Sequence, residues 1–167
     1  GSISVGNASI GMSGKGSGSG LRNDGNILIG QASEGMYGNE STDITNTGSI
    51  AGTSSNGIGI YAESTSGMTV NNTGTIDVQG NDSRGIYVKG TGIKTIANTG
   101  TVKTGNSTDA SKPGVGIYSG NAGDTITNNG TVETGASSVG IYSKSGIMNQ
   151  NKDIITGVNG TGIYADG

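Results

Sequence analysis

Few residues of this sequence could carry out chemistry. The 167 residues include no His and no Cys, so the chain lacks the usual nucleophile–base pairs and soft metal ligands. Asp77, Lys103 and Glu133 each directly follow an Ile or Val of a recurring motif. A polysaccharide lyase or hydrolase would instead need clustered carboxylates, usually beside Lys or Arg. We therefore predict a solvated column of alternating charge, and neither an enzyme nor a cofactor or metal site.

The tyrosines are the first candidate for ligand binding. All six Tyr follow a Gly-Ile or Gly-Met pair, and the central candidates are Tyr61, Tyr87, Tyr118 and Tyr142. A Tyr next to an inward-facing Ile should point outward, because neighbouring residues of a strand face opposite sides. The rings would then form a surface column, which either stiffens the protein as an aromatic ladder or offers a platform for sugars. The ladder is the simpler interpretation, because periodicity alone explains it.

An insertion is the second candidate. Residues 106–114 lengthen one repeat, contain the only Pro and include Asp109 and Lys112. Insertions in repeat proteins lie in loops on one face, which is often the binding face. Shorter polar stretches at 53–56 and 81–84 occur at the same position of their own repeats. We expect the three segments to lie along one edge, either as tolerated loops or as a composite binding surface.

Two alternating motifs must position these candidates. The first is Gly-Ile-Tyr or a variant of it, with copies that begin at Gly11, Gly35, Gly59, Gly85, Gly116, Gly140 and Gly162. The second is apolar-x-Asn-x-Gly-x-Ile/Val, with copies that begin at Leu21, Ile44, Val70, Ile96, Ile126 and, irregularly, Ile147. Successive copies of the first motif are 24, 24, 26, 31, 24 and 22 residues apart. The chain is therefore predicted to contain about seven imperfect repeats with a period near 24 residues.

The repeat pattern predicts an all-β fold. Short runs in which apolar and small polar residues alternate are typical of strands, and Gly is too frequent for helices. A period near 24 residues accommodates three short strands and three turns, whereas a propeller blade needs roughly 40 residues. We therefore predict a right-handed parallel β-helix, or solenoid, in which residues 1–167 form a single unit. The Ile residues of successive coils would stack inside it.

A column of Asn is expected beside this core. Each Asn follows an inward apolar residue by two positions, so it should face the interior or a corner. Stacked amides can hydrogen-bond along such a column. The structural ladder is expected to contain Asn46, Asn72, Asn98 and Asn128, with Asn23 before them and Asn149 after them. The Gly two residues after each Asn is expected to have a positive φ.

Composition limits the partners of the chain. A hydrophobic fraction of 29% is too small for one large round core, and a charged fraction of 13% is low for a disordered chain. The net charge of −3, with scattered Lys, excludes a nucleic-acid-binding surface. No apolar run approaches the roughly 20 residues that span a bilayer, and no signal peptide opens the sequence.

The two motifs together resemble a known family. Asn-Thr-Gly-Thr-Ile at 72–76 followed by Gly-Ile-Tyr at 85–87 is similar to the passenger repeats of type V secreted autotransporter proteins, above all the large outer-membrane adhesins of fusobacteria and their relatives. The resemblance covers nearly the whole chain. It implies export through the outer membrane by a C-terminal β-barrel, display on the bacterial surface, and roles in coaggregation, host-cell attachment or immune-receptor binding. It transfers no binding residues, because the repeats are scaffold.

Three hypotheses about function follow. The chain could be a piece of a longer surface adhesin that supports attachment by binding a protein or glycan of host cells or other bacteria. It could be a passive spacer with no binding activity of its own, or a fragment of a β-helical enzyme that acts on polysaccharides. Its only membrane contact would be through the C-terminal barrel, which this sequence lacks. End-to-end self-association is also expected, because end coils expose unpaired strand edges.

Overall fold

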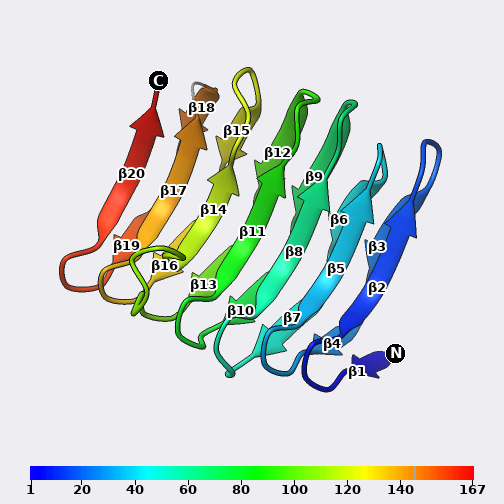
Figure 1. Ribbon diagram of the computed structural model, residues 1–167, viewed down its shortest axis with the longest axis horizontal. Coiled ribbons are helices and arrows are strands. Elements are labelled where there is room, and N and C mark those ends of the chain that lie inside the picture. Colours follow the sequence, from blue (N-terminus) through cyan, green and yellow to red (C-terminus); the bar gives the residue numbers. More distant parts are fainter. Residues whose placement is uncertain (145) are drawn as a thin grey trace.

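The computed structural model describes residues 1–144 and 146–167 and shows a parallel β-helix of about seven coils (Figure 1). Each complete coil contributes one strand to each of three parallel sheets. From the N-terminus the chain rises along the front sheet, crosses to the back, descends, and starts the next coil further to the left (Figure 1). That path is right-handed, as expected for parallel crossovers. The predicted fold is confirmed.

The three sheets differ in their place around the coil. Sheet A contains β1 (Ser2–Ser4), β4 (Asn26–Leu28), β7 (Ser49–Gly52), β10 (Thr75–Val78), β13 (Thr101–Thr104), β16 (Thr131–Thr134) and β19 (Ile154–Thr156). Sheet B, at the front of Figure 1, contains β2 (Ile10–Lys15), β5 (Glu34–Asn39), β8 (Ile58–Glu63), β11 (Arg84–Lys89), β14 (Val115–Ser119), β17 (Val139–Lys144) and β20 (Thr161–Asp166). Sheet C contains β3 (Gly20–Asn23), β6 (Asp43–Asn46), β9 (Met68–Asn72), β12 (Lys94–Asn98), β15 (Thr125–Asn128) and β18 (Ile147–Gln150).

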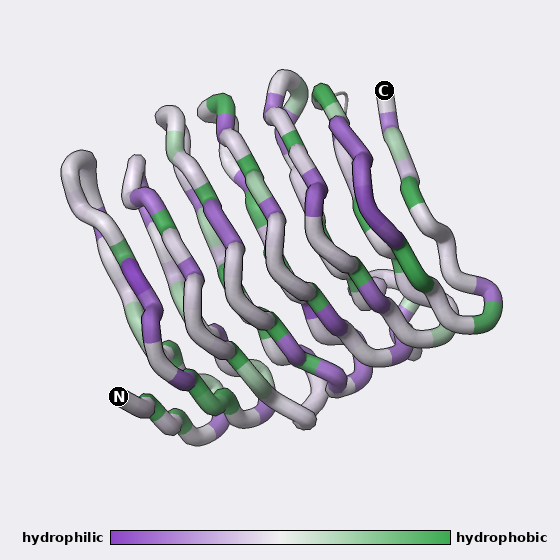
Figure 2. The backbone as a smooth tube through the Cα atoms, turned by 180° about the vertical axis from the view of Figure 1, so that it is seen from behind, coloured by the Kyte–Doolittle hydropathy of each residue, from purple (hydrophilic) through white to green (hydrophobic). Residues whose placement is uncertain are grey.

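The core is a stack of thin apolar layers, one per coil. In sheet B the pairing places Ile60 against Ile86, Ile86 against Ile117 and Ile117 against Ile141, and all four side chains are fully buried. Sheets A and C add their own inward columns of Ile and Val. In Figure 2 the hydrophobic segments accordingly recur at corresponding positions of successive coils. Each apolar side chain is therefore covered by its counterparts in neighbouring coils, as the sequence predicts.

Sheet B bends at the Gly of the Gly-Ile-Tyr motif. In β11, Gly85 and Ile86 are both buried, whereas Arg84 and Tyr87 on either side are both partly exposed. A Cβ atom on Gly85 would collide with a methyl group of Val102 in sheet A. Glycine is required here because sheet A packs directly against this backbone. The bend places residues three apart, such as Arg84 and Tyr87, on the same outer surface.

The prediction of a positive φ at the glycines after the Asn column is wrong. Gly48, Gly74 and Gly100 have no positive φ. Instead, a Cβ atom on Gly74 would collide with the carbonyl oxygen of Gly48 one coil earlier, and one on Gly100 with that of Gly74. These glycines allow the corners of successive coils to stack at close range. The left-handed backbone lies at other turns, for example at Asn56 (φ 60°) and Asp82 (φ 57°).

The last coil corrects the predicted register. Met148, not Ile147, pairs with Ile126, and Gln150, not Asn149, pairs with Asn128. Because side chains alternate along a strand, this shift of one residue reverses the faces. Met148 packs against the core, whereas Ile147 is exposed. The register is favoured because Met supplies an apolar side chain, and Gln supplies the same amide group as Asn one methylene further out.

Candidate functional site

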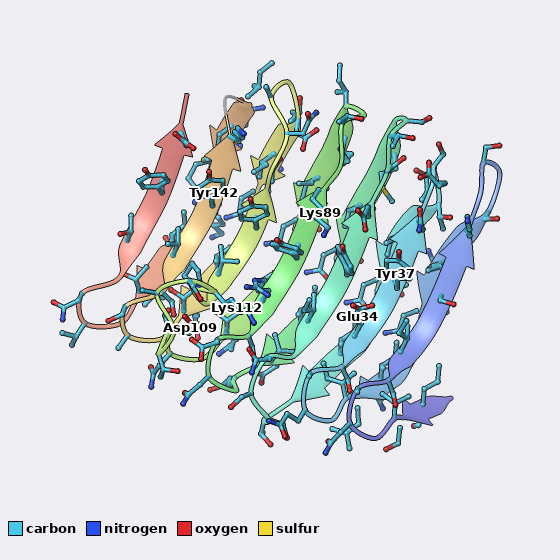
Figure 3. All side chains as sticks on the ribbon, in the orientation of Figure 1. Glu34, Tyr37, Lys89, Asp109, Lys112 and Tyr142 are labelled. Atoms are coloured by element: carbon cyan, nitrogen blue, oxygen red, sulfur yellow. The ribbon has the colours of Figure 1, made fainter. Side chains whose placement is uncertain are left out.

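The tyrosines form one continuous column on the outer face of sheet B (Figure 3). Its members are Tyr37, Tyr61, Tyr87, Tyr118, Tyr142 and Tyr164. Successive ring centroids are 5.1, 5.6, 4.6, 4.7 and 5.5 Å apart. The three C-terminal pairs are stacked, with interplanar angles of 29°, 10° and 13°. The column is thus an aromatic ladder, and each such contact stabilises the fold by about 0.5–1.5 kcal/mol.

The stacking determines what the rings can offer to a ligand. A sugar platform needs an open ring face, but the rings of Tyr118 and Tyr142 turn their faces toward each other. The same holds for Tyr87 and Tyr118. What the middle of the column presents to solvent is a row of ring edges and hydroxyl groups.

Two of the tyrosine hydroxyls donate hydrogen bonds to carboxylates. The Tyr61 hydroxyl donates to Glu63 Oε2 at 2.8 Å, and the Tyr142 hydroxyl donates to Asp166 Oδ2 at 3.0 Å. Burial, followed by the hydrogen bond to Asp166, raises the pKa of Tyr142 to about 12. Burial and then the bond to Glu63 also raise the pKa of Tyr61. These hydroxyls remain protonated near neutral pH, so the column is a set of hydrogen-bond donors and not of bases.

Two cations lie over the rings. The Arg84 guanidinium carbon is 4.9 Å from the centroid of the Tyr87 ring, and Lys89 Nζ is 5.3 Å from that of Tyr61. Both distances are within the range of cation–π attraction. Lys89 Nζ also lies 4.0 Å from Glu63 Oε1. Simple alternation would place Arg84 on the same side as the inward-facing Ile86, so sequence reasoning missed it, and only the bend at Gly85 brings it to the tyrosines.

The inserted loop is tied to the preceding coil by Asp82. Its carboxylate accepts hydrogen bonds from the Thr108 amide at 2.6 Å, the Thr108 hydroxyl at 2.5 Å and the Asp109 amide at 2.9 Å. Burial acts to raise the pKa of Asp82, but these hydrogen bonds and the charge of Arg84 outweigh it and lower the pKa below its usual value. The polar stretches 53–56 and 81–84 also stack on each other, because the Asn56 amide donates to the Asn81 carbonyl. The three polar segments therefore lie along one edge, as predicted.

Asp109 and Lys112 shape the loop itself. Asp109 Oδ1 accepts from the Ser111 amide at 2.8 Å and from the Ser111 hydroxyl at 2.6 Å. The Lys112 amide donates to the Asp109 carbonyl at 3.0 Å. Both residues lie on the loop beside the tyrosine face (Figure 3), but neither lines the hollow described next. The structure thus gives Asp109 a role in holding the turn.

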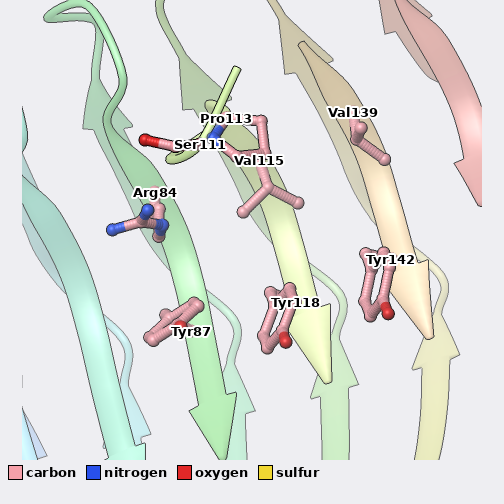
Figure 4. A pocket seen from close by; sticks show the side chains of 8 residues that line it. All are labelled: Arg84, Tyr87, Ser111, Pro113, Val115, Tyr118, Val139 and Tyr142. Atoms are coloured by element: carbon pink, nitrogen blue, oxygen red, sulfur yellow. The ribbon is translucent and has the colours of Figure 1, made fainter. Parts of the chain in front are cut away.

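A hollow of about 260 Å³ lies where the loop meets the tyrosine column (Figure 4). Arg84 and the edges of three tyrosine rings form one side, with Val115 and Val139 beside them and the loop above. The lining residues are Arg84, Tyr87, Ser111, Pro113, Val115, Tyr118, Val139 and Tyr142. Three of the four predicted tyrosines and the insertion therefore meet in one place, whereas Tyr61 lies outside it. We call this the Arg84 hollow.

The asparagines form a second ladder, inside the protein at the corner that follows sheet C. Each Nδ2 donates to the Oδ1 of the next Asn at 2.7–2.8 Å, in the order Asn23, Asn46, Asn72, Asn98 and Asn128. The last donor, Asn128 Nδ2, reaches Gln150 Oε1 at 3.2 Å, so Asn149 is not a rung. Each inner rung also donates to the carbonyl of the Gly two residues later. This arrangement is structural and leaves no amide directed at a ligand.

The predicted charge column is present on sheet A. Asp77 pairs in register with Lys103, and Lys103 with Glu133. Lys103 Nζ lies 2.8 Å from Glu133 Oε2, and this hydrogen bond raises the pKa of Lys103. Both side chains are about one third exposed, so the pair contributes little to stability. A cation separates the two acids, unlike the facing carboxylates of a glycosidase.

A buried ion pair was not predicted from the sequence. Lys94 Nζ lies 3.9 Å from Asp124 Oδ1 in the next coil, and both side chains are fully buried. Lys94 Nζ also donates to the carbonyls of Gly90 and Gly92, while Asp124 Oδ2 accepts from the Ser119 hydroxyl at 2.5 Å. Burial lowers the pKa of Lys94, and the charge of Asp124 opposes that shift. The only signal in the sequence is that Lys94 occupies the position of the apolar Met68 one repeat earlier.

The described residues contain no group of three or more His, Cys, Asp and Glu side chains that could hold a metal ion. No helix among them is long and apolar enough to cross a membrane.

The fold and these ladders define a class of protein, the parallel β-solenoid stabilised by side-chain columns that run from coil to coil. Comparison with protein-family models, with curated proteins and with solved structures found no match for this chain.

Proposed function

We propose that this chain is a scaffold segment of a bacterial surface adhesin, which supports attachment to host cells or other bacteria. The observation that carries the proposal is the continuity of the ladders. The Ile column, the Asn ladder and the Tyr column pass from coil to coil. A solenoid of this kind extends by repetition and holds other parts of a molecule at a distance. The resemblance to autotransporter passenger repeats supports the surface location.

The distribution of charge supports scaffolding over catalysis. Acidic side chains are dispersed along the rod and are engaged by neighbours, as Glu63 is by Tyr61 and Glu133 by Lys103. Hydrolysis or elimination of a polysaccharide would need two ionisable groups converging on one bond. A passive spacer and a directly adhesive segment share the same scaffold, and they differ in whether the outer face binds a surface protein or glycan.

In the isolated chain the two end coils expose apolar surface, which supports association of its copies end to end. Ile163 is 44% exposed, whereas its counterpart Ile141 one coil earlier is fully buried. At the other end Ile3 is 36% exposed and its counterpart Ile27 only 1%. Apolar end faces with unpaired strand edges favour head-to-tail contacts. Sedimentation velocity should show larger species as the concentration rises, and they should diminish with Ile163→Lys. A monomer at all concentrations would contradict this part of the proposal.

Surface display and attachment can be tested separately. Antibodies raised against the purified, folded chain should label intact cells of the source bacterium. Labelling that requires permeabilised cells would contradict surface display. The labelled chain is also added to epithelial cells and partner bacteria, with free sugars and amino acids as competitors. Saturable, competitor-sensitive binding would identify an adhesive segment, whereas the absence of binding by a folded chain would identify a spacer.

A further inference from the structure

Among the described residues, the cation that lines the Arg84 hollow makes no direct ion pair with an acid. Arg84 is the only charged residue among those that line it. In the described part of the chain no acidic side chain forms an ion pair with its guanidinium. The guanidinium instead lies over the Tyr87 ring. A partly buried cation of this kind is well placed to accept an anion from outside.

The nearby acids are occupied elsewhere. Asp82 uses its carboxylate to hold Thr108 and Asp109, and the Asp109 carboxylate holds Ser111. Asp166 lies three coils further along the rod than Arg84, and it accepts a hydrogen bond from the Tyr142 hydroxyl. Glu34 lies in the same column as Arg84 but two coils away. The charge of Asp82 still acts on Arg84, but no ion pair joins the two side chains, so the guanidinium can pair directly with an anionic ligand.

The walls of the hollow determine the rest of the ligand. Pro113, Val115 and Val139 are apolar, and Tyr87 and Tyr118 contribute ring edges. The only other polar side chains are the tyrosine hydroxyls and Ser111, whose hydroxyl already donates to Asp109. A pyranose ring would leave most of its hydroxyl groups without partners here, which is costly. A compact apolar or aromatic body fits these walls better.

We propose that the Arg84 hollow binds an apolar carboxylate, with the carboxylate on the Arg84 guanidinium and an apolar or aromatic body between the tyrosine edges and Val115, Val139 and Pro113. Bidentate pairing of guanidinium and carboxylate would fix the orientation of the ligand. A free carboxylic acid and the C-terminal residue of a peptide share this chemistry. The inference rests on the hollow alone and does not need the chain to lie on a cell surface.

The test uses the purified chain and 3-phenylpropionate as the probe, with 3-phenylpropionamide as its neutral match. In an NMR titration with the acid, we expect the backbone amide signals of Arg84, Tyr87 and Tyr118 to shift until the site is saturated. The neutral amide should bind at least about tenfold more weakly, because it lacks the charge-assisted pair. The Arg84→Gln substitution should weaken binding of 3-phenylpropionate by a similar factor. Lys112→Gln is the control, because it removes a cation of the inserted loop that does not line the hollow. This substitution should leave binding unchanged.

A second arm distinguishes the two sources of the carboxylate. A short peptide that ends in Phe with a free carboxylate is compared with the same peptide carrying a C-terminal amide. Binding of the peptide acid well above that of 3-phenylpropionate would assign the site to a protein C-terminus, and the reverse order would assign it to a free acid. The proposal is overturned if neither acid binds at millimolar concentration, if acid and amide bind equally, or if Arg84→Gln has no effect.

Discussion

Replacing one inner rung of the Asn ladder tests how strongly the coils are linked. Asn72 is fully buried, accepts from Asn46 Nδ2 at 2.8 Å and donates to Asn98 Oδ1 at 2.8 Å. In Asn72→Ala both bonds between rungs are lost, together with the longer bond from Asn72 Nδ2 to the Gly74 carbonyl. Asn46 Nδ2 retains the longer bonds to the Gly48 and Thr75 carbonyls, but Asn98 Oδ1 keeps no donor. A lost hydrogen bond costs about 1 kcal/mol and a buried unsatisfied acceptor about 1–3 kcal/mol, so the free energy of unfolding should fall by about 2–5 kcal/mol.

The neighbouring residue provides a matched control. Asn71 lies in the same strand β9 but faces outward, and its counterpart in the next coil is already Ala97. Asn71→Ala should therefore change the free energy of unfolding by less than about 0.5 kcal/mol. Asn23→Ala, at the first rung, removes only one bond between rungs and should cost about half as much as Asn72→Ala.

Urea unfolding followed by circular dichroism measures all three variants against the original chain. The expected order of destabilisation is Asn72→Ala first, Asn23→Ala second and Asn71→Ala last. If Asn72→Ala and Asn71→Ala shift the unfolding midpoint equally, the ladder does not stabilise the fold and the reasoning is refuted. Unchanged slopes of the unfolding free energy against urea would confirm that the comparison reports stability.

Three further changes probe other parts of the structure. Gly74→Ala should destabilise the fold by about 1–3 kcal/mol in urea unfolding, because its Cβ would collide with the Gly48 carbonyl oxygen; a neutral effect would contradict the close stacking. Asp124→Ala should cost about 3–5 kcal/mol, because it leaves Lys94 buried without its counter-ion. Adding Lys94→Met should recover much of that loss, and no recovery would count against a role for the charge. Because burial and Asp166 raise the pKa of Tyr142 to about 12, the unfolded chain releases that proton first, near the usual tyrosine pKa of about 10. Stability should accordingly fall between about pH 10 and 12, and Tyr142→Phe should flatten that part of the unfolding profile.

The period of the sequence was sufficient to predict the fold. Gly-Ile-Tyr recurs near every 24 residues, and stacking like residues in successive coils leaves few other ways to bury so small a hydrophobic fraction. The outward position of Tyr87 and the inward position of Ile86 followed from alternation alone. The inward Asn ladder followed in the same way, because Asn72 lies two residues after Val70.

The failures have specific physical causes. Alternation along the strand does not reveal a bend, so the sequence alone does not place Arg84 beside Tyr87. That placement depends on the packing of Gly85 against sheet A. A residue-type motif does not reveal a slip of one residue, so Asn149 was expected where Gln150 lies. The buried Lys94 was unexpected because only its partner in another coil, 30 residues away, explains its burial.

Each coil of the solenoid is held by its neighbours on both sides. Native-state hydrogen exchange, resolved by peptide, measures this directly. We expect the slowest exchange in the central strands β8 to β13, with protection that falls gradually toward both end coils. Uniform protection along the rod, or a maximum in an end coil, would contradict stabilisation by neighbouring coils.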